Sequence, residues 1–242
     1  EVLKAKLPLK EGVKKGESPL VLDKVTYDKQ TIYFLPNKDA QQAKIYFYID
    51  GFNYAIADDV TIDAFNQYFS GGFNGLVMQE IRENNSMAYT AVGRLVTPPI
   101  QQKQTHFIGY VGTQPDKVAG AVDLYMSLLQ DMPEYPERLD NIKTYLKQSA
   151  LSKKPTFRSK STLYSNWNLL GYQDDPAKVN MEKIENLSFE QIKNFYQTQI
   201  KNKPVTIIIF GDPKLIDLKT IKSKYGKINK LSNNTLFSKL SM

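Results

Sequence analysis

Alternating apolar and polar residues predict several strands along the chain. In KIYFYID, Ile45, Phe47 and Ile49 alternate with Tyr46 and Tyr48, which is typical of a strand with one buried face. TIYFLP, AYTAVGRLV and HFIGYVG have strand character as well. The continuous apolar run PVTIIIFGD indicates a strand that is covered on both faces.

Apolar residues at helical spacing lie between these strands. A helix is predicted over residues 58–69, where Ile62, Phe65 and Phe69 share one face, and the Gly-Gly pair that follows is expected to end it. This helix separates the first two predicted strands from the rest of the sheet.

Capping signals predict where further helices begin. Asn74 is expected to cap a second helix that ends near the Asn-Asn pair, and helices are predicted after Thr113 and Pro136. In LSFEQIKNFY, Ser188 and Gln191 form a capping box. The order of strands and helices predicts an α+β fold, with a mixed, mostly antiparallel sheet packed against several helices.

The beginning of the chain differs in composition from the rest. EVLKAKLPLKEGVKKGESP is rich in Lys, Gly and Pro and has poor periodicity, so residues 1–30 are predicted to be a lead-in arm or an interdomain linker. Residues 31–242 are predicted to form a single α+β domain. The sequence is expected to be an excised or processed piece, because it starts with neither an initiator Met nor the apolar core of a signal peptide.

Apolar runs and cysteine content bear on the compartment. No apolar run approaches the ~18 residues of a membrane span, so we expect a soluble protein without a membrane span. The chain has no cysteine, which excludes disulfides and thiolate chemistry and leaves the cytoplasm and the periplasm both open.

The net charge of +7 comes mainly from lysine, since only four of the 32 basic residues are arginines. Proteins that recognise nucleic acids usually use arginine side chains, which form two hydrogen bonds at once to a base or a phosphate. Scattered lysine is instead typical of a solvated surface. Nucleic-acid binding is an alternative function for the basic arm Lys4–Lys15 and the cluster of Lys153, Lys154, Arg158 and Lys160. The shortage of arginine disfavours it, so no nucleic-acid partner is predicted.

The inventory of reactive groups excludes several kinds of catalysis. Zinc hydrolases need about three protein ligands, usually including two histidines, but His106 is the only histidine. A Ser-His-Asp triad would need the same residue, and neither a Gly-x-Ser-x-Gly elbow nor a phosphate-binding glycine motif is present. The chain alone is therefore predicted to be inactive and to hold no metal or cofactor.

The stretch GGFNGLVMQEIRENNSMAYTAVGR carries a specific resemblance. Its order is a Gly-Gly break, a helix ending in Gln-Glu-x-Arg-Glu, and Ala-Tyr opening a strand. This order resembles the C-terminal, non-metal-binding domain of the pitrilysin/insulinase-type (M16) zinc metallopeptidases. LSFEQIKNFYQTQI and VTIIIFGDP follow in the order of that domain, so the resemblance covers most of the chain.

The resemblance implies a role within a larger zinc-dependent metalloendopeptidase. In that family an N-terminal domain carries His-x-x-Glu-His, which this chain lacks, so zinc is expected in a missing N-terminal domain or on a partner subunit. The C-terminal domain would complete the chamber that holds a peptide or an unfolded polypeptide substrate. The resemblance assigns Arg82 and Tyr89 an auxiliary catalytic role, in which both donate hydrogen bonds to the substrate carbonyl as negative charge develops.

One position departs from the family pattern. The family commonly has Gly-Leu-Ala-Tyr where this chain has Ser-Met-Ala-Tyr, with Ser86 in place of the glycine. Asn84 or Asn85 is expected to supply the left-handed backbone conformation instead. An alternative function remains open, in which the chain is a degenerate, non-catalytic member that acts as a scaffold or an assembly subunit.

Overall fold

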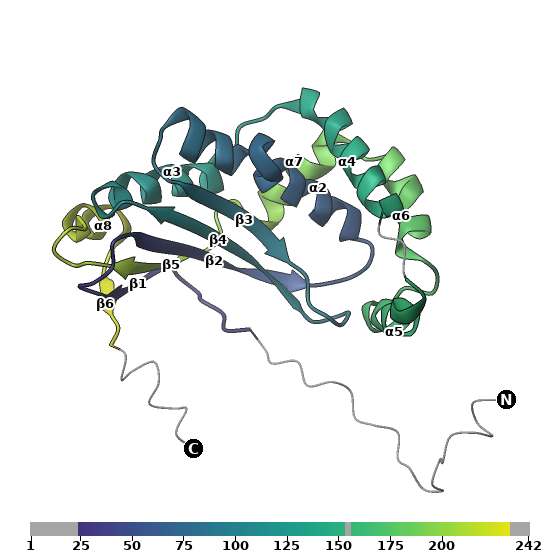
Figure 1. Ribbon diagram of the computed structural model, residues 1–242, viewed down its shortest axis with the longest axis horizontal. Helices are drawn as coiled ribbons and strands as arrows, with labels where there is room; N and C mark the ends of the chain where they lie inside the picture. The colour runs from purple at the N-terminus through teal and green to yellow at the C-terminus, as the bar shows by residue number, and fades with distance from the viewer. Residues whose placement is uncertain (1–23, 153–155, 233–242) are drawn as a thin grey trace, which may run out of the picture.

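A computed structural model describes residues 24–152 and 156–232, which form a mixed six-stranded sheet with helices packed on one face (Figure 1). The spatial order of the strands is β3-β4-β2-β5-β1-β6. Their bounds are β1 Thr31–Pro36, β2 Ala43–Asn53, β3 Thr90–Val96, β4 Gln104–Thr113, β5 Thr206–Gly211 and β6 Ile228–Lys230. Strands β3, β4, β2 and β5 pair antiparallel, whereas β1 lies parallel to β5 and β6. The predicted α+β class with a mixed, mostly antiparallel sheet is confirmed.

Several helices cover the upper side of the sheet in Figure 1. The helix bounds are α2 Asp59–Ser70, α3 Val118–Gln130, α4 Leu139–Ser152, α5 Lys160–Leu170, α6 Pro176–Glu185, α7 Phe189–Gln199 and α8 Leu218–Tyr225. The capping box at the start of α7 is confirmed, because the Ser188 side chain accepts from Gln191 N and Gln191 Oε1 accepts from Ser188 N. The Thr113 cap is wrong, since Thr113 ends β4 and its hydroxyl donates to the Met87 carbonyl.

Successive side chains in each strand point alternately to the face under the helices and to the opposite, open face of the sheet. In β2, Ile45, Phe47 and Ile49 are buried under the helices, and the intervening tyrosines lie on the other side. The expectation that β5 is covered on both faces is wrong, because Ile208 and Phe210 are only partly buried. The sequence of β5 is therefore continuously apolar even though helices cover only one of its faces.

The open face carries exposed apolar residues. Tyr46, Val92 and Ile108 are exposed there. The labelled helices that pack on the sheet lie on its other side (Figure 1). The chain just before β1 crosses part of this face: Tyr48 donates to the Val25 carbonyl at 2.9 Å, and Asp50 accepts from Tyr27 N at 2.7 Å. The described residues therefore leave much of this face uncovered.

Two glycines let α3 pack close to the sheet. Gly93 in β3 and Gly109 in β4 are cross-strand partners, and a Cβ on either would meet the side chain of Tyr125. The Tyr125 hydroxyl donates to the Val92 carbonyl at 2.9 Å, and its ring stacks on Phe47 with centroids 4.0 Å apart. The buried tyrosine thus fills the space that the absent side chains leave.

The free edge of β3 is closed by side chains of α2. The Asn66 amide both accepts from Leu95 N at 2.7 Å and donates to Leu95 O at 3.0 Å, and Ser70 Oγ accepts from Gly93 N at 3.0 Å. Exposed edges invite pairing with other chains. These bonds satisfy part of the β3 edge without a neighbouring strand.

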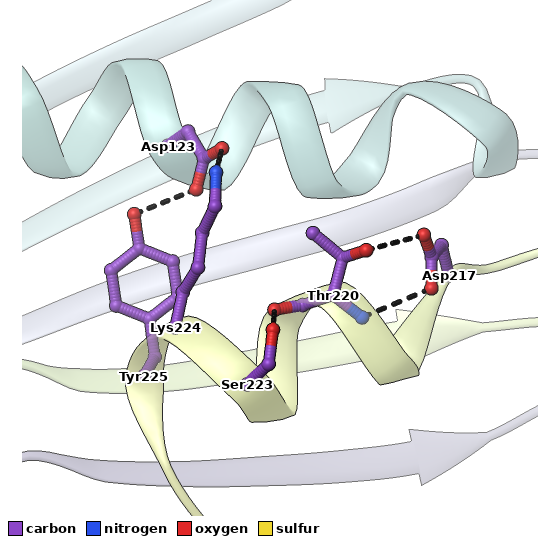
Figure 2. Close-up of polar contacts among 6 residues, drawn as sticks. All are labelled: Asp123, Asp217, Thr220, Ser223, Lys224 and Tyr225. Carbon is purple, nitrogen blue, oxygen red and sulfur yellow. Dashed lines mark hydrogen bonds and ion pairs between the residues drawn. The ribbon is translucent and has the colours of Figure 1, made fainter.

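Polar contacts hold α8 against α3, as Figure 2 shows. The Asp123 carboxylate accepts from the Tyr225 hydroxyl at 2.8 Å and forms an ion pair with Lys224. At the other end of α8, Asp217 caps the helix by accepting from Thr220 N at 3.1 Å. The short helix is thereby fixed at both ends, and β6 follows it at the edge of the sheet.

Two sequence-based predictions fall partly beyond these ranges. Residues 1–23 of the predicted arm and the lysines at positions 153 and 154 lie outside the described residues. No helix within the described ranges is long and apolar enough to span a bilayer.

Candidate functional site

The segment between α2 and β3 carries the two residues that the sequence singled out. After α2, residues Gly72–Asn74 form a 3₁₀ turn and Gly75 is extended. Met78–Asn84 then form a π-helix that contains Arg82. The Asn74 cap is therefore wrong, because Asn74 lies inside the 3₁₀ turn and Gly75 interrupts the chain before the helix begins. A π-helix is a rare, widened turn that occurs frequently at functional sites.

The turn that follows the π-helix aims the chain into β3. Ser86 itself adopts the left-handed conformation, with φ 50°, whereas Asn85 has φ −116°. The expectation that Asn84 or Asn85 supplies this conformation is therefore wrong, because neither asparagine has a positive φ. Lys117 Nζ donates to the Ser86 carbonyl at 2.9 Å, and Met87 N donates to Ile81 O at 2.8 Å. These bonds hold the backbone in a conformation that a serine rarely adopts.

The structure brings Arg82 and Tyr89 together at one surface. The Arg82 guanidinium carbon lies 5.3 Å from the centre of the Tyr89 ring and 6.0 Å from the centre of the Phe73 ring. Tyr89 is 78% exposed, while its backbone N–H donates to Gly112 O at 3.2 Å. The main chain is thus fixed to β4, and the side chain projects into solvent beside the guanidinium.

Both side chains retain hydrogen-bond donors. Arg82 Nε lies 3.3 Å from Glu83 Oε1. Within residues 24–152 and 156–232, neither the terminal nitrogens of Arg82 nor the Tyr89 hydroxyl makes a hydrogen bond. The two residues line an open hollow of about 450 Å³, together with Gln42, Gln114 and Lys117 among others. The site can therefore donate hydrogen bonds to an incoming acceptor from two directions.

The histidine and the acidic residues do not form a metal centre in the described part of the chain. No group of three His, Asp or Glu side chains is placed there to bind a metal ion. His106 lies opposite Asp50 on the open face, with its ring 5.7 Å from that of Tyr48. Burial, with positive charge from Lys24 and Arg94, lowers the pKa of His106.

Two carboxylates at helix starts, Asp59 and Asp175, have structural contacts. Asp59 accepts from the Tyr54 hydroxyl at 2.7 Å and from the Tyr172 hydroxyl, and Asp175 caps α6 by accepting from Ala177 N at 2.9 Å. Burial, followed by the hydrogen bond to Asp59, raises the pKa of both tyrosines. Asp59 and Asp175 line a cavity that does not include Arg82 or Tyr89.

Phe73 is the candidate residue that sequence reasoning missed. Its ring is 72% exposed and lies beside Arg82. The available signal is an aromatic residue directly after the Gly-Gly pair, but by itself this pair indicates only the end of a helix.

The family comparison agrees with the fold and with the lack of a metal group among the described residues. The family model of the Peptidase M16 inactive domain matches residues 4–146, which is more than half of the chain. The chain therefore belongs to the Peptidase M16 inactive-domain family. No match was found among curated proteins.

Solved structures share the fold at low sequence identity. The peptidase M16 inactive domain from Pseudomonas fluorescens is 18% identical with a TM-score of 0.65, and the match covers 82% of this chain and 47% of that chain. A protease from Helicobacter pylori is 14% identical with a TM-score of 0.68, covering 86% and 50%. A chain of complex III2 from Candida albicans is 13% identical with a TM-score of 0.55, covering 75% and 46%. The chain thus spans about half the length of these structures.

Proposed function

We propose that this chain is the C-terminal, substrate-binding domain of a zinc-dependent metalloendopeptidase that cleaves peptides or unfolded polypeptides. Zinc would be held by a homologous domain or subunit that carries the metal motif, and this chain would complete the chamber around the substrate. A zinc ion in that other domain would supply the activated water for hydrolysis.

The observation that carries the proposal is the pairing of Arg82 with Tyr89 at one surface. Peptide hydrolysis places negative charge on the carbonyl oxygen, and preorganised donors stabilise that charge. A guanidinium and a phenol are both suitable donors. The terminal nitrogens of Arg82 and the exposed Tyr89 hydroxyl would bind this oxygen when the substrate enters the hollow.

The open sheet face supports the proposed partner. Exposed apolar side chains such as Tyr46 and Ile108 lie on a face that the described residues leave uncovered. The chain spans about half of the solved structures with this fold. A second domain or subunit packed on this face would bring a metal site opposite Arg82 and Tyr89.

The hydroxyl of Tyr89 can be tested in the complete parent protein, with any stable partner, by cleavage of a quenched fluorescent peptide at equal zinc content. Tyr89→Phe is expected to lower kcat on the order of 10²-fold, as the loss of one such donor does. Tyr164→Phe is the matched control, because Tyr164 is also an exposed tyrosine but lies on α5. It is expected to leave kcat unchanged.

Two outcomes would overturn the proposal in different ways. An active parent protein that is indifferent to Tyr89→Phe would remove the role of Tyr89 and leave the family membership intact. A parent protein with neither zinc nor peptidase activity would instead indicate a scaffold or an assembly subunit.

A further inference from the structure

Phe73 is displayed at the surface by a loop that is firmly held. Gly71 N donates to Gln67 O at 2.9 Å at the end of α2, and Gly72 has φ 61°, a conformation that favours glycine. The chain reverses there and presents the Phe73 ring with 72% of it exposed. Single exposed apolar side chains are common at protein surfaces. What distinguishes Phe73 is that its ring lies beside the Arg82 guanidinium.

A single arginine braces this loop against the π-helix. Arg138, the last residue of the 3₁₀ turn Pro136–Arg138 before α4, donates from Nη1 to Asn74 O at 2.9 Å and from Nη2 to Gln79 Oε1 at 2.6 Å. Its guanidinium also lies 4.5 Å from the centre of the Tyr135 ring. Asn74 adjoins Phe73, and Gln79 lies three residues before Arg82. Arg138 therefore fixes the two segments whose spacing sets the distance from Phe73 to Arg82.

The chemistry of the contact favours a role in orienting the guanidinium. The face of an aromatic ring attracts a cation within about 6 Å of its centre, and both Phe73 and Tyr89 lie within that distance of Arg82. An arginine on an exposed helix surface otherwise samples many rotamers, and ordering it on binding is costly. Rings on the neighbouring segments restrict those rotamers before the substrate arrives.

We propose that Phe73 is a positioning residue: braced by Arg138, its ring holds the Arg82 guanidinium with the terminal nitrogens facing the substrate hollow. This inference rests on the proposed function, because it concerns how Arg82 meets the substrate carbonyl. It adds a device that acts through Arg82 and makes no contact with the substrate itself.

The test uses peptide cleavage by the zinc-loaded parent protein with three substitutions. Phe73→Leu keeps an apolar side chain but removes the ring, so kcat is expected to fall by about two- to five-fold, in keeping with an exposed cation–π contact. Phe73→Tyr keeps the ring and is expected to retain kcat. Phe157→Leu changes another exposed phenylalanine, located before α5, and serves as the matched control.

The Arg82→Met background separates positioning from other roles. If Phe73 acts through Arg82, Phe73→Leu has no further effect on kcat in that background. Equal losses for Phe73→Leu and Phe73→Tyr, or a persistent loss in the Arg82→Met background, would overturn the inference. A loss from Arg82→Met with none from Phe73→Leu would overturn only this inference. If Arg82→Met leaves kcat unchanged, or if the zinc-loaded protein does not cleave the peptide, the proposed function is overturned and this inference with it.

Discussion

Replacing Gly93 by alanine is expected to lower the free energy of unfolding by about 2 kcal/mol, because overpacking a well-filled core typically costs ~1–3 kcal/mol. A Cβ at this position would meet the Tyr125 hydroxyl first, and then Phe107 Cζ and Phe69 Cε1 at 2.9 Å each. Tyr125 is fully buried, and its hydroxyl is held by the Val92 carbonyl. The tyrosine therefore has no free space into which it can turn.

The Tyr125 hydroxyl distinguishes the two glycines of this pair. Tyr125→Phe alone is expected to cost about 1 kcal/mol, the usual net value of one hydrogen bond. Combined with Gly93→Ala, it removes the closest clash, so the double variant should be at least as stable as Gly93→Ala. Combined with Gly109→Ala, it should give no such rescue, because Tyr125 Cζ and Cε1 would remain 2.6 and 2.9 Å from the new Cβ.

Urea denaturation followed by circular dichroism would measure these differences, provided that the m-value is the same for all variants. The account predicts a coupling of at least about 1 kcal/mol between Gly93→Ala and Tyr125→Phe, since contacting residues do not add independently. Additive losses for that pair, or equal rescue at both glycines, would refute the packing described for β3, β4 and α3.

Three further outcomes are expected. Ser86→Gly should raise the free energy of unfolding by about 1 kcal/mol in urea denaturation, because a left-handed residue other than glycine costs ~1–2 kcal/mol, and Ser86→Val should lower it. Asp59→Ala should lower the free energy of unfolding by about 3 kcal/mol, because the buried hydroxyls of Tyr54 and Tyr172 lose their shared acceptor. A lower midpoint of thermal unfolding would show this loss of stability. Burial raises the pKa of Tyr68 from 10.0 to about 12, so its stabilising contribution is complete below pH 10 and is lost as the pH rises through 12. The urea midpoint should fall over that range, and less so in Tyr68→Phe.

Features set by local pattern could be predicted from the sequence. The alternation in KIYFYID gave β2 its buried face, and the pair Ser188 and Gln191 fixed the start of α7 through contacts three residues apart. Such signals need no knowledge of distant residues. The α+β class followed from the order of these elements.

Features set by contacts between distant segments could not be predicted. The parallel pairing of β1 with β5 and β6 joins the two ends of the described chain, and no local pattern encodes it. The left-handed conformation at Ser86 is held in part by Lys117, whose Nζ donates to the Ser86 carbonyl from 31 residues further along the chain. Phe73 was missed for the same reason, because its relation to Arg82 is set by an arginine from the turn before α4.

The pairing of Arg82 and Tyr89 followed from the sequence only through the resemblance to a known family. Their spacing of seven residues is uninformative by itself, and the contact depends on the π-helix and on the turn at Ser86.

The affinity of a phosphinic peptide for the zinc-loaded parent protein would show whether Arg82 and Tyr89 act on the charged carbonyl oxygen. Such an inhibitor carries an anionic oxygen where the substrate develops one. Across wild type, Arg82→Met and Tyr89→Phe, the account predicts that inhibitor affinity and kcat/KM fall by the same factor, because both measure binding of the transition state. Inhibitor affinity that stays constant across the three proteins would contradict it.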